Sequence, residues 1–112
     1  MPVMMPIRLA VTTGFLMGVI VAVQAATTVT VTQHGLAMSQ KSASISRGDR
    51  IVFGNDDDVI HNIHVFGPGE GDSIDLGLQK PGVSLSYKFD KAGSYRIRCS
   101  IHPSIKMAVT VK

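Results

Sequence analysis

The sequence predicts an all-β sandwich or barrel of about seven strands. Short runs rich in β-branched and aromatic residues alternate between apolar and polar side chains, which is typical of strands with one buried face. Turns that contain glycine or proline separate these runs at short intervals. No stretch has the length and periodicity of a helix. These observations favour a single β domain.

Seven runs carry the strand pattern. They span residues 27–33, 43–46, 50–54, 61–66, 83–89, 94–99 and 107–111. The clearest run places Val83, Leu85, Tyr87 and Phe89 in alternation with polar residues. The glycine-rich run of residues 67–71 is predicted to be a loop.

The first 25 residues are predicted to be a cleaved secretory signal outside the fold. Arg8 is the only charged residue among the first 40, and a mostly apolar run follows it up to Val23-Gln24-Ala25, a small-residue cleavage pattern. An uncleaved membrane anchor is the alternative, but the run is about 15 residues long where a spanning helix needs roughly 20. We therefore expect a mature domain of residues 26–112 in the periplasm or another exported location.

Charge and cysteine content narrow the function classes. The formal net charge is +3, or +2 once Arg8 is removed. Neither a basic run nor an aromatic series accompanies this small excess, so we expect no nucleic-acid binding. Cys99 is the only cysteine. In an exported protein it is therefore a free thiol, an intermolecular bridge or a metal ligand.

Three soft donors lie within nine residues near the C-terminus: the thiol of Cys99, the imidazole of His102 and the thioether of Met107. Such ligands suit copper better than calcium, magnesium or manganese. Strand-like sequence flanks the segment, so the donors are expected on a loop between two strands. Upstream, His61 could complete a trigonal site of two histidines and one cysteine with a weak axial Met, the blue-copper arrangement.

Each candidate has a structural alternative. Cys99 could be a buried structural thiol, and Met107 could simply fill space in the core. His102 could be an ordinary surface-loop histidine. The spacing of the three residues favours metal ligation over these alternatives. His64 lies three residues after His61, on the opposite face of a strand, so the two are not expected to reach one metal. We choose His61.

Other polar residues are assigned structural roles. His64 and His34 are expected to be solvated or hydrogen-bonded. The run Asp56-Asp57-Asp58 is expected to be a solvated turn, because adjacent carboxylates cannot converge on calcium and no matching Glu follows.

The pattern Cys-x2-His-x4-Met, with His61-Asn62 upstream, resembles the cupredoxins, the small type 1 copper proteins of the plastocyanin, pseudoazurin and amicyanin group. Further matching segments are residues 47–53, Asn55 and residues 92–95. The resemblance covers roughly residues 27 to 112. It implies a Greek-key sandwich and a hydrogen bond from Asn62 to Ser100. It also implies one copper ion, bound by His61, Cys99, His102 and Met107.

We expect a one-electron carrier and not an enzyme. Four ligands would close the metal site, and a mature chain of residues 26–112 leaves little room for a substrate pocket. Zinc is the rival metal, but it is redox-inert and methionine is not a usual zinc ligand. The alternative function is copper binding or copper delivery without obligatory redox turnover. A third hypothesis is a domain that zinc stabilises without any redox role.

The expected partners are redox proteins, such as a c-type cytochrome or a dehydrogenase or reductase, that dock transiently on a monomer without stable membrane insertion. Electrons are expected to leave through His102 in its surface loop. An apolar rim of Ile101, Pro103 and Ile105 would surround it, with Lys106 and the Asp56 to Asp58 run steering the partner. Alternatively, Ile101 and Ile105 turn inward and close the end of the barrel.

Overall fold

The computed structural model describes Met4 and residues 12–14, 17–20 and 25–112. The predicted signal peptide, residues 1–25, falls largely on the remaining positions and so lies outside the described residues. In the described part of the chain, no helix has the length and apolar character needed to cross a membrane.

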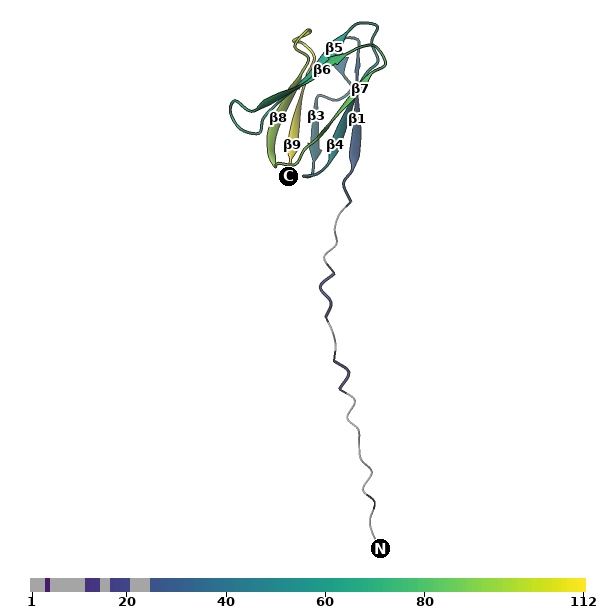
Figure 1. Cartoon of the computed structure of the whole chain (residues 1–112), viewed down its shortest axis with the longest axis vertical. Coiled ribbons are helices and arrows are strands. Elements are labelled where there is room, and N and C mark those ends of the chain that lie inside the picture. The colour runs from purple at the N-terminus through teal and green to yellow at the C-terminus, as the bar shows by residue number, and fades with distance from the viewer. Residues whose placement is uncertain (1–3, 5–11, 15–16, 21–24) are drawn as a thin grey trace.

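Within the described residues, nine strands form two sheets that pack face to face (Figure 1). The strands are β1 (Thr28–His34), β2 (Ala37–Met38), β3 (Ser42–Ile45), β4 (Arg50–Asn55), β5 (His61–Phe66), β6 (Ser73–Gln79), β7 (Ser84–Lys88), β8 (Gly93–Arg98) and β9 (Lys106–Val111). One sheet has the order β2-β1-β4-β7 and the other the order β3-β9-β8-β5-β6. The predicted all-β sandwich is confirmed.

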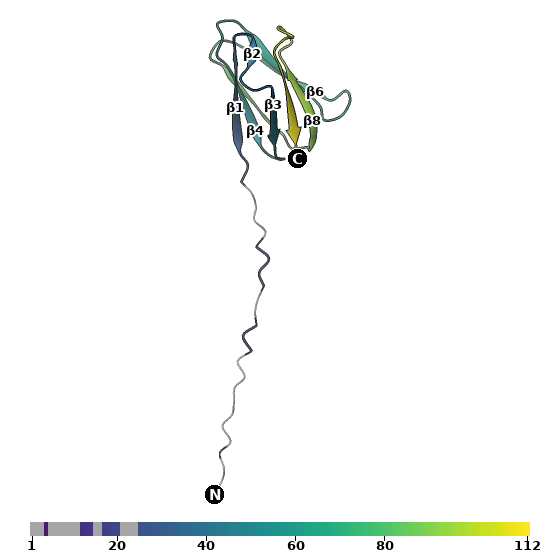
Figure 2. The same cartoon turned by 180° about the vertical axis from the view of Figure 1, so that it is seen from behind.

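Each sheet contains one parallel pair, which shows that the chain crosses between the sheets. β1 runs parallel to β4 and places Val31 opposite Phe53. β3 runs parallel to β9 and places Ile45 opposite Val111. The remaining pairs are antiparallel. Figure 2 shows β1, β3 and β4 side by side in projection although β3 belongs to the other sheet.

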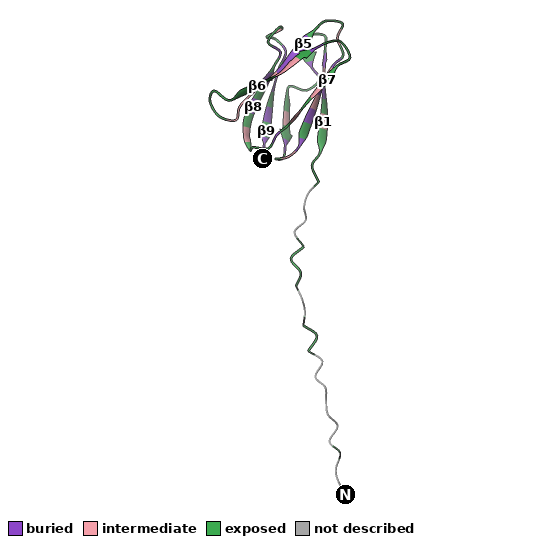
Figure 3. Ribbon diagram, viewed as in Figure 1, coloured by how far each residue is buried: buried purple, intermediate pink, exposed green. Residues whose placement is uncertain are grey.

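The core lies between the sheets and follows the alternation of the strands (Figure 3). In β8, Tyr95 and Ile97 are buried while Arg96 and Arg98 are exposed. Phe89 packs edge-on against Tyr87 and Tyr95, with ring centroids 4.8 and 5.0 Å apart. Burying a large apolar side chain stabilises a fold by about 1.5–3 kcal/mol, so this continuous cluster fixes the positions of the strand ends that carry the polar residues.

Two strands were not predicted from the sequence. β2 has only two residues and pairs with β1 across a tight turn, in which Gly35 and Leu36 have φ of 61° and 60°. β6 is an edge strand whose side chains are mostly exposed, and Gly77 within it has φ of 105°. An edge strand that buries little apolar surface lacks the alternation from which a strand is inferred.

Candidate metal centre

Three of the four predicted donor residues converge at one end of the sandwich. His61 is the first residue of β5, and Cys99 directly follows β8. His102 lies in the loop that joins β8 to β9, and Met107 is the second residue of β9. Figure 1 shows this loop, in yellow, at the end of the sandwich opposite the N-terminal segment. His61, Cys99 and His102 form a cluster of potential metal ligands.

The three donor atoms form a nearly equilateral triangle. The Nδ1 atoms of His61 and His102 are 3.1 Å apart. The Sγ of Cys99 is 3.7 Å from the first and 3.9 Å from the second. A point equidistant from the three lies about 2.1 Å from each, and bonds from zinc to nitrogen and thiolate ligands have similar lengths, about 2.0–2.3 Å. The triangle therefore fits a single metal ion, and two histidine nitrogens with one cysteine sulfur are the donor set that type 1 copper sites use.

Burial separates the cluster from bulk water on all but one side. His61 and Cys99 are 0% exposed, whereas His102 is partly exposed. The imidazole rings of the two histidines meet edge-on, with centroids 5.0 Å apart. A metal held here would therefore be enclosed largely by the core, and His102 is the least buried of the three residues.

Asn62 fixes the cysteine end of the loop, as predicted. Its backbone N–H lies 3.4 Å from the Sγ of Cys99. Its side-chain Nδ2 donates to Ser100 Oγ at 3.3 Å, and its Oδ1 accepts the backbone N–H of Ser100. These bonds tie β5 to the loop and add a donor to the thiolate, so the expected link from Asn62 to Ser100 is confirmed.

Ile105 does not belong to the exposed rim predicted from the sequence. It is 0% exposed, because the loop folds back at this residue. Its carbonyl accepts the N–H of Cys99 at 3.1 Å, and its N–H donates to the carbonyl of His102 at 2.9 Å. Its side chain consequently enters the core beneath the loop. Ile101, by contrast, is 48% exposed. The prediction of an exposed rim was therefore wrong at Ile105 but not at Ile101.

His64 and His34 lie outside the cluster, in agreement with the prediction. The Nδ1 of His64 is 3.4 Å from Ser100 Oγ, and its ring stacks on Phe66. The side chain of His34 is 75% exposed. Its pKa is raised, first by the hydrogen bond to the backbone carbonyl of Asp56 and then by the charges of Asp56 and Asp57.

Asp57 departs from the solvated turn predicted for residues 56–58. Its side chain is only 9% exposed, against 77% for Asp56, and its Oδ2 lies 2.7 Å from the Nε2 of His61. The pKa of the Asp57 carboxyl is lowered, first by this hydrogen bond and then by the backbone N–H groups of Gly35 and Leu36, although burial opposes the shift. Because residues 56–58 are all aspartates, the sequence did not indicate which of them would face the site.

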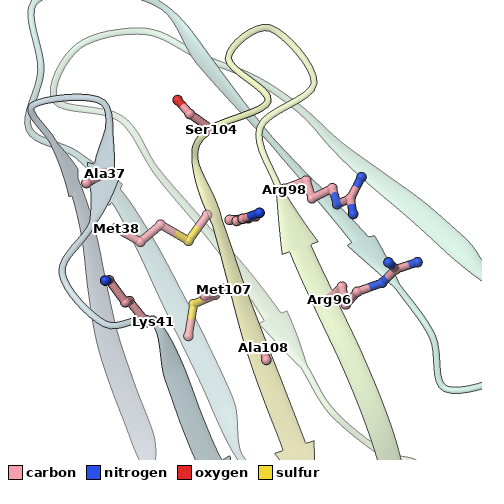
Figure 4. A pocket seen from close by; sticks show the side chains of 9 residues that line it. Ala37, Met38, Lys41, Arg96, Arg98, Ser104, Met107 and Ala108 are labelled. Atoms are coloured by element: carbon pink, nitrogen blue, oxygen red, sulfur yellow. The ribbon is translucent and has the colours of Figure 1, made fainter.

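Met107 is 3% exposed and lines a groove of about 500 Å³ beside the cluster (Figure 4). The lining residues are Ala37, Met38, Lys41, Arg96, Arg98, Ser104, Lys106, Met107 and Ala108. Four of these nine described residues are cationic and none is acidic. Figure 4 shows Arg96 and Arg98 projecting from the neighbouring strand. The role of Met107 as axial ligand stays a prediction.

Comparison with known proteins agrees with this geometry. A family model described as copper binding proteins of the plastocyanin/azurin family matches residues 25–112. Plastocyanin of Vicia faba is 36% identical over 83 residues, covering 65% of this chain and 83% of that protein. The methylamine utilization protein MauL of Methylorubrum extorquens is 30% identical over 82 residues, covering 72% of this chain and 70% of that protein.

The solved structures agree on the fold. An amicyanin variant in its reduced state matches with a TM-score of 0.68 and 22% identity, covering 76% of this chain and 82% of that chain. The family match extends over the whole sandwich, and it includes both His61 on β5 and the loop that carries Cys99 and His102. On this evidence, the chain belongs to the plastocyanin/azurin family of copper-binding proteins.

Proposed function

We propose that this protein carries one electron at a time between redox proteins. The carrier would use one copper ion held by His61, Cys99 and His102, with Met107 as the axial ligand. The observation that carries the proposal is the convergence of two Nδ1 atoms and one Sγ, 3.1–3.9 Å apart, at the enclosed end of the core. When bound, copper supplies a one-electron couple between Cu(II) and Cu(I). Membership of a copper-binding family supports the assignment.

The packing around the donors favours electron transfer over chemistry on a substrate. His61 and Cys99 are fully buried, so a substrate has no direct access to those two ligands. Hydrogen bonds from Asn62 and within the loop hold the cysteine side in place. Ligands fixed in this way change position little when the metal is reduced, and a small rearrangement favours rapid electron exchange. Copper delivery, in contrast, requires ligands that open readily.

Electron exchange can be separated from copper delivery by two rates measured on the same protein. The Cu(I) form is mixed either with an oxidised small-molecule acceptor or with an excess of a Cu(I) chelator. A carrier exchanges electrons far faster than it releases the ion. Rapid loss of copper to the chelator together with slow electron exchange would favour the delivery function.

The partly exposed His102 is proposed as the electron exit. Exposed apolar side chains lie in the loops of the same end: Leu36, Val59, Ile60 and Ile101, each 41–49% exposed. They form a rim that suits a small, transient interface. The cationic side chains of the neighbouring groove would steer a negatively charged partner toward it.

The exit is tested by the electron self-exchange rate, measured by NMR on mixtures of oxidised and reduced protein. Ile101→Asp should slow self-exchange at least several-fold and leave the copper spectrum unchanged. Ile74→Asp is the control, because Ile74 is 45% exposed on β6, where it pairs with Val65 along β5. Equal rates in the two variants would move the exit to another face.

We further propose export of the chain with cleavage after Ala25, followed by function as a monomer. The family match begins at residue 25 and β1 begins at Thr28, so the fold needs none of the preceding apolar run. Expression of the full chain in a bacterium should give a periplasmic product whose intact mass corresponds to residues 26–112. A product that retains the leader would contradict the cleavage.

A further inference from the structure

The largely enclosed carboxylate of Asp57 touches the donor cluster without belonging to it. The Oδ2 of Asp57 lies 2.7 Å from the Nε2 of His61, and the side chains of the two residues are 9% and 0% exposed. The adjacent Asp56 has a side chain that is 77% exposed. The contact between Asp57 and His61 is therefore shielded from water, unlike an ordinary surface ion pair.

This contact determines which nitrogen of His61 can bind a metal. A carboxylate only accepts hydrogen bonds, so Nε2 must carry the proton that it donates to Asp57. In the neutral imidazole, which is the form that binds metals, the lone pair then lies on Nδ1, the atom that faces Cys99 and His102. Asp57 thus selects the tautomer that the site requires, in the way that carboxylates orient metal-bound histidines elsewhere.

The carboxylate is itself held from two sides. Its Oδ1 accepts the backbone N–H of Gly35 at 2.7 Å, and its own backbone N–H donates to Asn55 Oδ1 at 2.9 Å. The Nδ2 of Asn55 in turn donates to the carbonyls of Val59 and Gln79 at 2.8 and 2.9 Å. The position of the charge is therefore fixed by the turn that follows β1, by β4 and, through Asn55, by β6.

We propose that Asp57 is a positioning residue that, through His61, stabilises Cu(II) relative to Cu(I) and so lowers the reduction potential of the site. The inference rests on the proposed function. A fixed negative charge interacts more strongly with the more highly charged oxidation state, and partial burial weakens the screening by water. Its hydrogen bond from Nε2 also increases the electron density that the imidazole offers at Nδ1. Reduction adds one electron to the metal and leaves this charge in place.

The test compares Asp57→Asn with Asp56→Asn. Both remove one negative charge, one residue apart in the same turn, but only Asp57 contacts His61. At a fixed applied potential, Asp57→Asn should raise the ratio of Cu(I) to Cu(II) by about tenfold, which is about 59 mV for one electron. Asp56→Asn should change the ratio by less than about twofold. Equal shifts in the two variants, or no shift in either, would overturn the proposal.

A second measurement keeps the test independent of copper and of the stability of the variants. The ¹⁵N shifts of His61 in the metal-free wild-type protein should show a protonated Nε2 and an unprotonated Nδ1. Asp57→Glu should retain this tautomer and Asp57→Ala should lose it. A wild-type His61 protonated on Nδ1 would refute the role of Asp57. Failure of the wild-type protein to bind copper, with the Nε2 tautomer present, would refute the proposed function instead.

Discussion

Gln79 makes a buried polar link between the two sheets, and its contacts allow the cost of replacing it to be worked out. It is 0% exposed. Its Nε2 donates to the carbonyls of Phe53 and Val83 at 2.6 and 2.8 Å. Its Oε1 accepts the Nε2 of Gln33 at 2.6 Å. Replacement by leucine, of similar size, removes all three hydrogen bonds.

The expected loss of stability differs between replacing Gln79 and replacing Gln33. A hydrogen bond contributes about 1 kcal/mol net, and each buried group left without a partner costs more, so Gln79→Leu should lower the free energy of unfolding by about 3–5 kcal/mol. Gln33→Leu removes only the bond shared with Gln79, since Gln33 Oε1 has no partner among the described residues. Its cost should be about 1–2 kcal/mol. The double variant loses the shared bond once, so its cost should fall below the sum by about 1 kcal/mol.

Urea unfolding of the metal-free protein measures these differences. The midpoint should fall most for Gln79→Leu, while the slope of free energy against urea stays at the wild-type value, because the surface exposed on unfolding is unchanged. Equal losses in the two single variants, or strict additivity in the double variant, would refute the reasoning. Strict additivity would mean that the two side chains do not share a buried hydrogen bond, and equal losses would mean that the bonds from Gln79 to Phe53 and Val83 contribute nothing to stability.

Two further predictions concern acid and metal. The Asp49 carboxylate accepts the backbone N–H groups of Thr27 and Ser46, each at 2.9 Å, and these bonds lower its pKa. Its contribution to stability is therefore present above the ordinary carboxyl pKa of about 4 and is lost as the pH falls through the lower folded-state pKa. Acid titrations of unfolding should be shallower in Asp49→Asn than in wild type; identical profiles would exclude this role. Copper that binds only the folded state should stabilise it by about 2.7 kcal/mol at a free concentration one hundred times Kd, raising the melting temperature by about 10–20 °C. Calorimetry with and without copper measures this difference, and equal melting temperatures would count against a folded-state metal site.

The sequence was most informative where a short-range pattern determines the structure. The strand pattern predicted seven of the nine strands in the described residues, because most of these seven turn apolar side chains toward the opposite sheet. The edge strand β6 was not predicted, because its side chains are mostly exposed. Cys99 and His102 share one loop, so their spacing alone placed them together. The two-residue period of a strand placed His61 and His64 on opposite faces, and the resemblance of His61-Asn62 to the cupredoxin pattern favoured His61.

Tertiary contacts determined the features that the sequence did not show. Asp57 turns inward because its carboxylate binds Gly35, in the turn after β1, and His61, at the start of β5. Ile105 turns inward because the loop closes on Cys99 and His102. Neither contact follows from composition or periodicity, and the buried bond between Gln33 and Gln79 joins residues 46 positions apart in the sequence.

The visible absorption spectrum of the purified protein with one equivalent of Cu(II) tests the central claim most directly. The account predicts an intense charge-transfer band from the Cys99 thiolate, with a stoichiometry of one copper per chain. Cys99→Ser should lose this band, whereas His64→Ala should retain it. A wild-type protein that binds copper without the band, or a Cys99→Ser variant that keeps it, would contradict the assignment of the site.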